Sequence, residues 1–101
     1  ISIYKMIKGE YTPVYTYQQP VNFCHVVWGG TLLGEPSFIF GVREERKNLF
    51  IVRYRDGKFV EQELESGFGP SNITVIHHEK EDIIAVANRE KGEGALFILS
   101  E

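Results

Sequence analysis

The stretch PSFIFGVREERKNLFIVRYRDGKFVEQELE, residues 36 to 65, decides the fold because it contains three strand-like runs separated by two turns. The runs are Ser37–Val42, Leu49–Arg55 and Lys58–Glu65. The second turn is the clearer one, since Asp56-Gly57 supplies the two positive φ angles that a two-residue hairpin needs. We therefore predict that this stretch forms the middle of an antiparallel β-meander.

Segments on either side of this stretch repeat it in part. At an offset of 48, residues 1 to 11 fall without a gap on residues 49 to 59, and the turn glycines Gly9 and Gly57 coincide. At an offset of 50, Phe23–Trp28 falls on Ile73–His78. The remaining runs match at offsets of 45 and 47, so the period is 45 to 50 residues.

A repeat of this length built of short strands indicates β-propeller blades, because solenoid repeats of similar length are helical. The charged segment Gly41–Asn48 lacks the apolar spacing of a helix and is predicted to be a solvated turn. We predict an all-β fold of eight or nine strands in four-stranded antiparallel meanders, forming an incomplete propeller. Residues 1–18 would form a partial blade, 20–66 a complete blade and 69–101 a second partial blade. A small β-barrel or sandwich is the alternative if the repeat is accidental.

The order of an apolar strand, a Gly-rich connection, a second apolar strand, a charged turn and a hairpin resembles the FG-GAP or VCBS type of β-propeller repeat. The resemblance covers nearly all of the chain, about two blades, and implies an Asp- and Gly-rich calcium loop after the first strand of each blade. The matching segments here are Gly29–Pro36 and His78–Asp82. Neither offers the six to eight oxygen ligands that calcium requires. No calcium ion or other cofactor is therefore expected.

Four residues are candidates for ligand binding. Trp28 and His78 are both predicted to end an innermost strand, near the mouth of a propeller's central channel. An indole face and an imidazole ring together suit a sugar or another small polar ligand. The alternative is that Trp28 packs between blades and His78 is solvated. His25 and His77 complete the set, but adjacent histidines on a strand point to opposite faces. His25 would have to reach them from the neighbouring blade, so no metal site is predicted.

The charge pattern bears on the partners. The formal net charge is -3 with both signs interspersed, which gives no basic stripe for nucleic acid and no polybasic segment for a membrane. No apolar run approaches the ~20 residues of a membrane-spanning helix. Neither nucleic acid nor a membrane is an expected partner.

The lone Cys24 excludes an internal disulfide and is predicted to be a small core residue. The compartment stays open, with the cytoplasm slightly favoured.

Two functions remain, since no nucleophile with a plausible base and no phosphate-binding glycine loop can be identified. The first, which we favour, is a propeller module that binds a carbohydrate, another small polar ligand or a protein. The second is the propeller part of a carbohydrate-active lyase or dehydratase, in which histidines and acids of the channel act on a sugar. Whether this chain alone is an enzyme is left open.

Counting strands also gives an expectation about assembly. One complete blade with two partial neighbours would leave apolar faces uncovered. The chain begins at Ile1 and within a predicted strand, so we expect either a piece of a longer propeller or several copies that associate. The predicted core consists of alternating apolar residues of the strands: Phe23, Val27, Phe38, Phe40, Phe50, Val52, Ile73, Val75, Ile84, Val86, Phe97 and Leu99.

Overall fold

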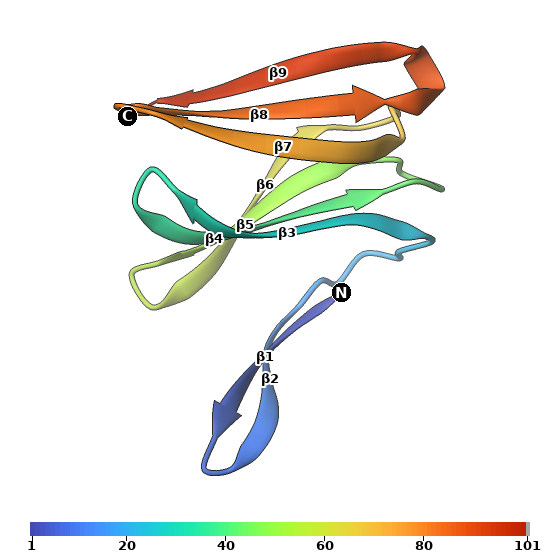
Figure 1. The fold of residues 1–101 in the computed structure, drawn as a ribbon. Coiled ribbons are helices and arrows are strands. Elements are labelled where there is room, and N and C mark those ends of the chain that lie inside the picture. Colours follow the sequence, from blue (N-terminus) through green and yellow to red (C-terminus); the bar gives the residue numbers. More distant parts are fainter. Residues whose placement is uncertain (101) are drawn as a thin grey trace.

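The computed structural model describes residues 1–100, and these residues confirm the predicted all-β fold class (Figure 1). No helix in this range is long and apolar enough to cross a membrane. The elements are nine strands and one 3₁₀ turn: β1 (Ser2–Ile7), β2 (Glu10–Thr16), β3 (Cys24–Leu32), β4 (Glu35–Val42), β5 (Leu49–Arg55), β6 (Lys58–Glu65), β7 (Pro70–His78), β8 (Glu81–Asn88), η1 (Arg89–Lys91) and β9 (Glu93–Ser100).

Residues 1–100 form three antiparallel sheets, each an open meander in which consecutive strands are hydrogen-bonded neighbours. The N-terminal sheet is β1-β2, the central sheet is β3-β4-β5-β6 and the C-terminal sheet is β7-β8-β9. The sheets are stacked, with the central sheet between the other two (Figure 1). Each face of the central sheet therefore has its own apolar core.

Three of the hairpin turns consist of a residue followed by glycine, both with positive φ. These are Lys8-Gly9 (φ 50° and 82°), Leu33-Gly34 (50° and 78°) and Asp56-Gly57 (51° and 77°). This geometry matches the twist of antiparallel strands, and glycine adopts it without steric cost. The first and third turns were predicted. The second was not, because β3 continues through Gly29 and Gly30 to Leu32 and the expected Gly-rich connection shrinks to two residues.

The core between the central and C-terminal sheets is built from one face of each. Ile39, Leu49 and Ile51 of the central sheet meet Ile84 and Val86 of β8 there, and all five are at most 4% exposed. Partly buried side chains close its margins: Trp28, Leu33, Leu64, Ile73, Val75 and Phe97. This face-to-face packing fixes how the two sheets sit on each other.

Aromatic side chains join the N-terminal sheet to the other face of the central sheet. The ring of Tyr17 stacks on that of Phe50 with centroids 4.4 Å apart, and the ring of Tyr15 lies 5.5 Å from that of Phe59. The Tyr15 hydroxyl donates a hydrogen bond of 2.7 Å to Glu61 Oε2. Together with Ile1 and Ile3, these tyrosines pack on a second buried cluster of the central sheet, which β4 and β5 supply: Phe40, Val42, Phe50 and Val52.

The predicted core is wrong at the start of β3. Phe23 and Val27 are 57% and 72% exposed, whereas Val26 is 5% exposed, and Cys24 is exposed as well. The pairing of β3 with β4 shifts register between Cys24 and Val26, and Phe23 has a φ of 62° that takes it out of the strand. Val27 shares a face with its partner Phe40, but Val27 is not among the residues that pack on the core cluster containing Phe40.

Replacing Phe50 with Ala is expected to lower the free energy of unfolding by ~3–5 kcal/mol. Phe50 is 2% exposed and stacks on Tyr17, so its loss leaves a cavity between two sheets. Urea denaturation measures the change, with Val27→Ala as the control. Val27 is 72% exposed and its replacement should cost less than ~0.5 kcal/mol. A loss below ~1 kcal/mol at Phe50 would contradict the assignment of this face.

Candidate functional site

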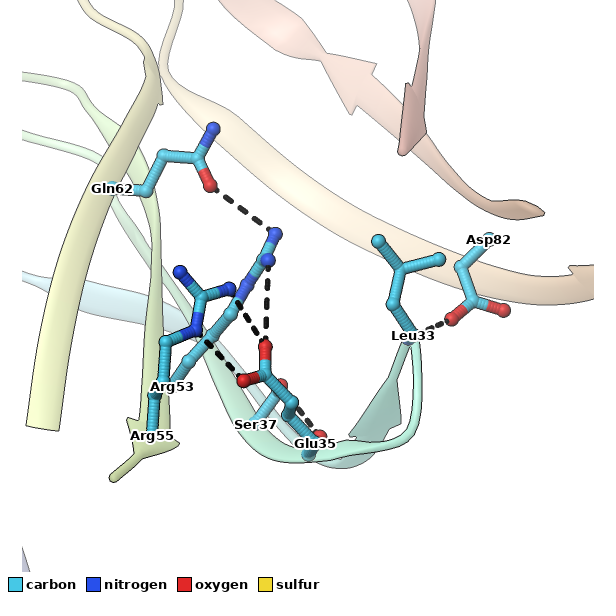
Figure 2. A network of polar contacts seen from close by, with 7 residues as sticks. All are labelled: Leu33, Glu35, Ser37, Arg53, Arg55, Gln62 and Asp82. Atoms are coloured by element: carbon cyan, nitrogen blue, oxygen red, sulfur yellow. Dashed lines mark hydrogen bonds and ion pairs between the residues drawn. The ribbon is translucent and has the colours of Figure 1, made fainter. Parts of the chain in front are cut away.

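Polar side chains gather where the β3-β4 and β7-β8 turns of neighbouring sheets lie close together. The backbone N–H of Leu33, in the first turn, donates a 2.6 Å hydrogen bond to Asp82 Oδ2 at the start of β8 (Figure 2). This bond links the central sheet to the C-terminal sheet at one edge of the core that they share. We call the surface around these two turns the turn-end site.

His77 and Asp82 form the most closely coupled pair of the turn-end site. They are direct partners in the β7-β8 register, and His77 Nδ1 lies 2.6 Å from Asp82 Oδ1. Asp82 is 6% exposed. Burial alone raises the pKa of its carboxyl, but the hydrogen bonds from the Leu33 N–H and from His77 outweigh burial and hold that pKa below its usual value. The carboxylate is therefore charged at neutral pH and fixes the orientation of the imidazole.

This pairing defines what the imidazole can do. When His77 is neutral, a charged carboxylate at Nδ1 favours the tautomer with the proton on Nδ1, which leaves a lone pair on Nε2. Within residues 1–100, Nε2 has no hydrogen bond, and the side chain is 56% exposed. His77 can therefore accept a hydrogen bond or a proton from a bound molecule.

A hollow of about 360 Å³ adjoins this pair. His77 and Asp82 line it from the C-terminal sheet, and Thr31 and Gly34 line it from the central sheet. Lys80, in the β7-β8 turn, adds a positive charge at its rim. The hollow thus offers a donor hydroxyl, an acceptor imidazole and charges of both signs to a small polar molecule.

A second polar cluster lies on the same end of the central sheet (Figure 2). Glu35 accepts two hydrogen bonds from Arg55, of 2.7 Å from Nε and 2.8 Å from Nη2. These bonds lower the pKa of the Glu35 carboxyl. Arg53 lies beside the pair, with Nη1 3.9 Å from Glu35 Oε1 and Nη2 donating 3.2 Å to Gln62 Oε1. Strands β4, β5 and β6 thus each contribute to one network.

The four residues predicted to bind a ligand do not come together in one site. Trp28 lies in the middle of β3 rather than at its end, opposite Ile39, and packs against the core between the two sheets. His25 lies at the opposite end of β3, where Nδ1 is 3.0 Å from the carbonyl oxygen of Ser71. His78 is exposed at the end of β7, opposite Glu81. His77 alone lines the hollow and pairs with Asp82.

Sequence reasoning missed the partners of His77. From the sequence, Asp82 was only one acidic residue of a segment that offers too few ligands for calcium. Glu35, Arg53 and Arg55 were not proposed as site residues. A signal was present, because a two-residue turn at Glu79-Lys80 makes residues 77 and 82 direct cross-strand partners. The two expected loop segments are mostly strand, and no group of three or more His, Cys, Asp or Glu within residues 1–100 is arranged to hold a metal ion.

Comparison with known proteins adds no relative. No family model matches the chain, and neither a curated protein nor a solved structure matches it.

Replacing Asp82 with Asn is expected to lower the free energy of unfolding by ~1–3 kcal/mol at pH 7, because a buried carboxylate that accepts two hydrogen bonds is lost. The folded-state pKa of Asp82 is below its unfolded value of ~3.9, so the contribution is present above that pH and is lost as the pH falls through the folded value.

Urea denaturation at a series of pH values, from neutral to well below the ordinary pKa of an aspartate, measures this effect. The difference between Asp82→Asn and the parent chain should shrink below pH ~4. Glu44→Gln, which removes the same charge from an exposed turn, is the control and should leave stability nearly unchanged. A difference between D82N and the parent that stays constant over this range would contradict the role of the charge.

Proposed function

We propose that this chain is an arc of a β-propeller that binds a small polar ligand, such as a carbohydrate, at the turn-end site. The observation that carries the binding proposal is the fixed His77–Asp82 pair beside a hollow shared by two sheets. A side chain whose orientation is set by a buried carboxylate is preorganised, so binding costs less conformational entropy. A protein partner that inserts a polar loop into the same hollow is the alternative ligand.

The blade interpretation is supported by the register of the sheets. Leu32 pairs with Glu35 in the central sheet as His78 pairs with Glu81 in the C-terminal sheet, an offset of 46 (78 minus 32). The N-terminal sheet matches β5-β6 at an offset of 48 (57 minus 9 at the turn glycines). In the N-terminal and the central sheet, the equivalent face packs against the sheet that follows in the chain. Such a stack of equivalent meanders is typical of propeller blades.

This interpretation requires partners at both ends of the stack. Tyr4, Met6 and Tyr11 are 59%, 50% and 73% exposed on the N-terminal sheet. Leu96 and Ile98 are 67% and 60% exposed on the C-terminal sheet. Apolar surface of this kind marks an interface. Further blade-like sheets would cover it, supplied by the rest of a longer chain or by other copies of this one.

The assembly proposal predicts that the 101-residue chain self-associates in dilute solution. The double variant Leu96→Lys/Ile98→Lys should shift the molar mass toward the monomer, because charges on the outer face of the C-terminal sheet oppose its burial. Static light scattering after size exclusion measures the mass. Val60→Lys, which places a charge on β6 at a residue 42% exposed, is the control. A stable, folded monomer of the parent chain would overturn the assembly proposal.

The binding proposal predicts that His77→Gln weakens a sugar ligand while His78→Gln does not. The two histidines are neighbours, but only His77 is held by Asp82 at the hollow. Removing one hydrogen bond to a ligand should raise Kd by roughly threefold to tenfold. Glycan-array screening of the parent chain would identify the sugar, and calorimetry of the two variants would measure Kd. Equal losses in both variants, or a parent chain that binds no glycan, would count against the site.

A second function, part of a carbohydrate-active lyase or dehydratase, is favoured by Nε2 of His77, which makes no hydrogen bond within residues 1–100. An imidazole oriented by a carboxylate is the arrangement used for general-base catalysis. In an elimination, His77 would remove a proton from the carbon beside a sugar carbonyl or carboxyl group, and the leaving group would depart from the next carbon. Formation of a conjugated double bond, followed by ultraviolet absorbance and lost in His77→Gln, would distinguish this function from binding alone.

A further inference from the structure

Arg53 carries a positive charge that its surroundings compensate only in part. The residue is 9% exposed, yet its closest approach to a carboxylate within residues 1–100 is the 3.9 Å between Nη1 and Glu35 Oε1. Its one hydrogen bond in this range goes to the neutral amide oxygen of Gln62, and Nε is buried without a partner. Buried arginines are ordinarily paired and hydrogen-bonded, because an uncompensated buried charge is costly.

The nearby carboxylate is already engaged. Glu35 receives a two-pronged interaction from Arg55, with both of its oxygens within 2.8 Å of the guanidinium. Within residues 1–100, two guanidinium groups therefore share one carboxylate, which leaves one positive charge in excess. Burial and the repulsion from Arg55 lower the pKa of Arg53 more than Glu35 raises it. The direction of this shift agrees with the geometry: within residues 1–100, the charge of Arg53 lacks a matching anion.

An open space lies next to this charge. Arg53 and Arg55, together with Glu35, Leu33 and Ser100, line a hollow of about 380 Å³ between the end of the central sheet and the end of β9. Sites for small molecules commonly have volumes of ~300–1,000 Å³. The hollow is next to the one that contains His77, since Leu33 lines both.

We propose that the Arg53–Arg55 hollow binds a small ligand through a carboxylate group, as in a uronic acid. The planar guanidinium group forms paired hydrogen bonds with a carboxylate, and a neutral sugar cannot form this charged contact. The ligand carboxylate supplies the charge that Glu35 does not. This inference rests on the binding function proposed above and specifies the ligand as an acidic sugar that extends from the His77 hollow to Arg53.

The test is a titration of the full chain, followed by nuclear magnetic resonance, with glucuronate, acetate and glucose at constant ionic strength. Glucuronate should shift the side-chain N–H signals of Arg53 and Arg55 and those of the turn residues around His77. Acetate should shift the arginine signals alone, and glucose should bind ~10-fold or more weakly than glucuronate. Equal binding of glucose and glucuronate would overturn the inference.

Variants separate a ligand contact from a structural role. Arg53→Met should weaken glucuronate by ~10-fold or more and leave the stability of the free chain unchanged or raised, because an uncompensated charge is replaced by an apolar side chain. Arg46→Met is the control, since Arg46 pairs with Glu63 at 3.1 Å on the exposed surface. Arg53→Lys keeps the positive charge but lacks the planar guanidinium group, so it should bind glucuronate more weakly than the parent chain. If Arg53→Met does not fold, this variant decides whether Arg53 contacts the ligand.

The outcomes also distinguish this inference from the function on which it rests. If sugars shift the signals around His77 but Arg53→Met binds glucuronate as the parent does, the binding function stands and the carboxylate site is wrong. If Arg53→Met loses stability and keeps its affinity, Arg53 is a structural partner of Glu35. If none of the three probes shifts any signal, the carboxylate site is wrong, and the glycan screen described above decides the binding function separately.

Discussion

The central sheet is apolar on both faces, and the rest of the structure depends on covering them. The clearest sign is β5, where Leu49, Phe50, Ile51 and Val52 are consecutive and none is more than 2% exposed. Successive residues of a strand point to opposite faces, so a run of this kind is stable only between two layers. The C-terminal sheet supplies one layer and the tyrosines of the N-terminal sheet supply part of the other.

Turn chemistry and strand composition were sufficient to predict the all-β fold, a count of eight or nine strands and the hairpins at Lys8-Gly9 and Asp56-Gly57. They were insufficient for β3. An extended strand alternates its faces regularly, but the shift between Cys24 and Val26 is a local departure that no period-two pattern contains. The prediction therefore buried Val27 where the structure buries Val26.

The candidate site was harder to predict than the fold, and for a different reason. Trp28 was matched with His78 by aligning residue types. Equivalent positions in two hairpins are instead found by counting from their turns. Once Leu33-Gly34 is known to be a turn, Leu32 and not Trp28 corresponds to His78. His77 was identified from sequence, but its partner Asp82 depends on the same turn-based register.

The way the strands connect also determines how the chain reaches its native state. Every strand pair joins neighbours in sequence, so each sheet closes only short loops and forms with little entropic cost. Contacts between sheets, such as the bond from Leu33 to Asp82, span a longer separation, so we expect them to form later. The N-terminal sheet is a lone hairpin held by side chains such as Tyr15 and Tyr17, and we expect it to dock last and to detach first. The connectivity thus favours folding as a series of meanders that assemble onto the central one, with opening of the native state from the N-terminal end.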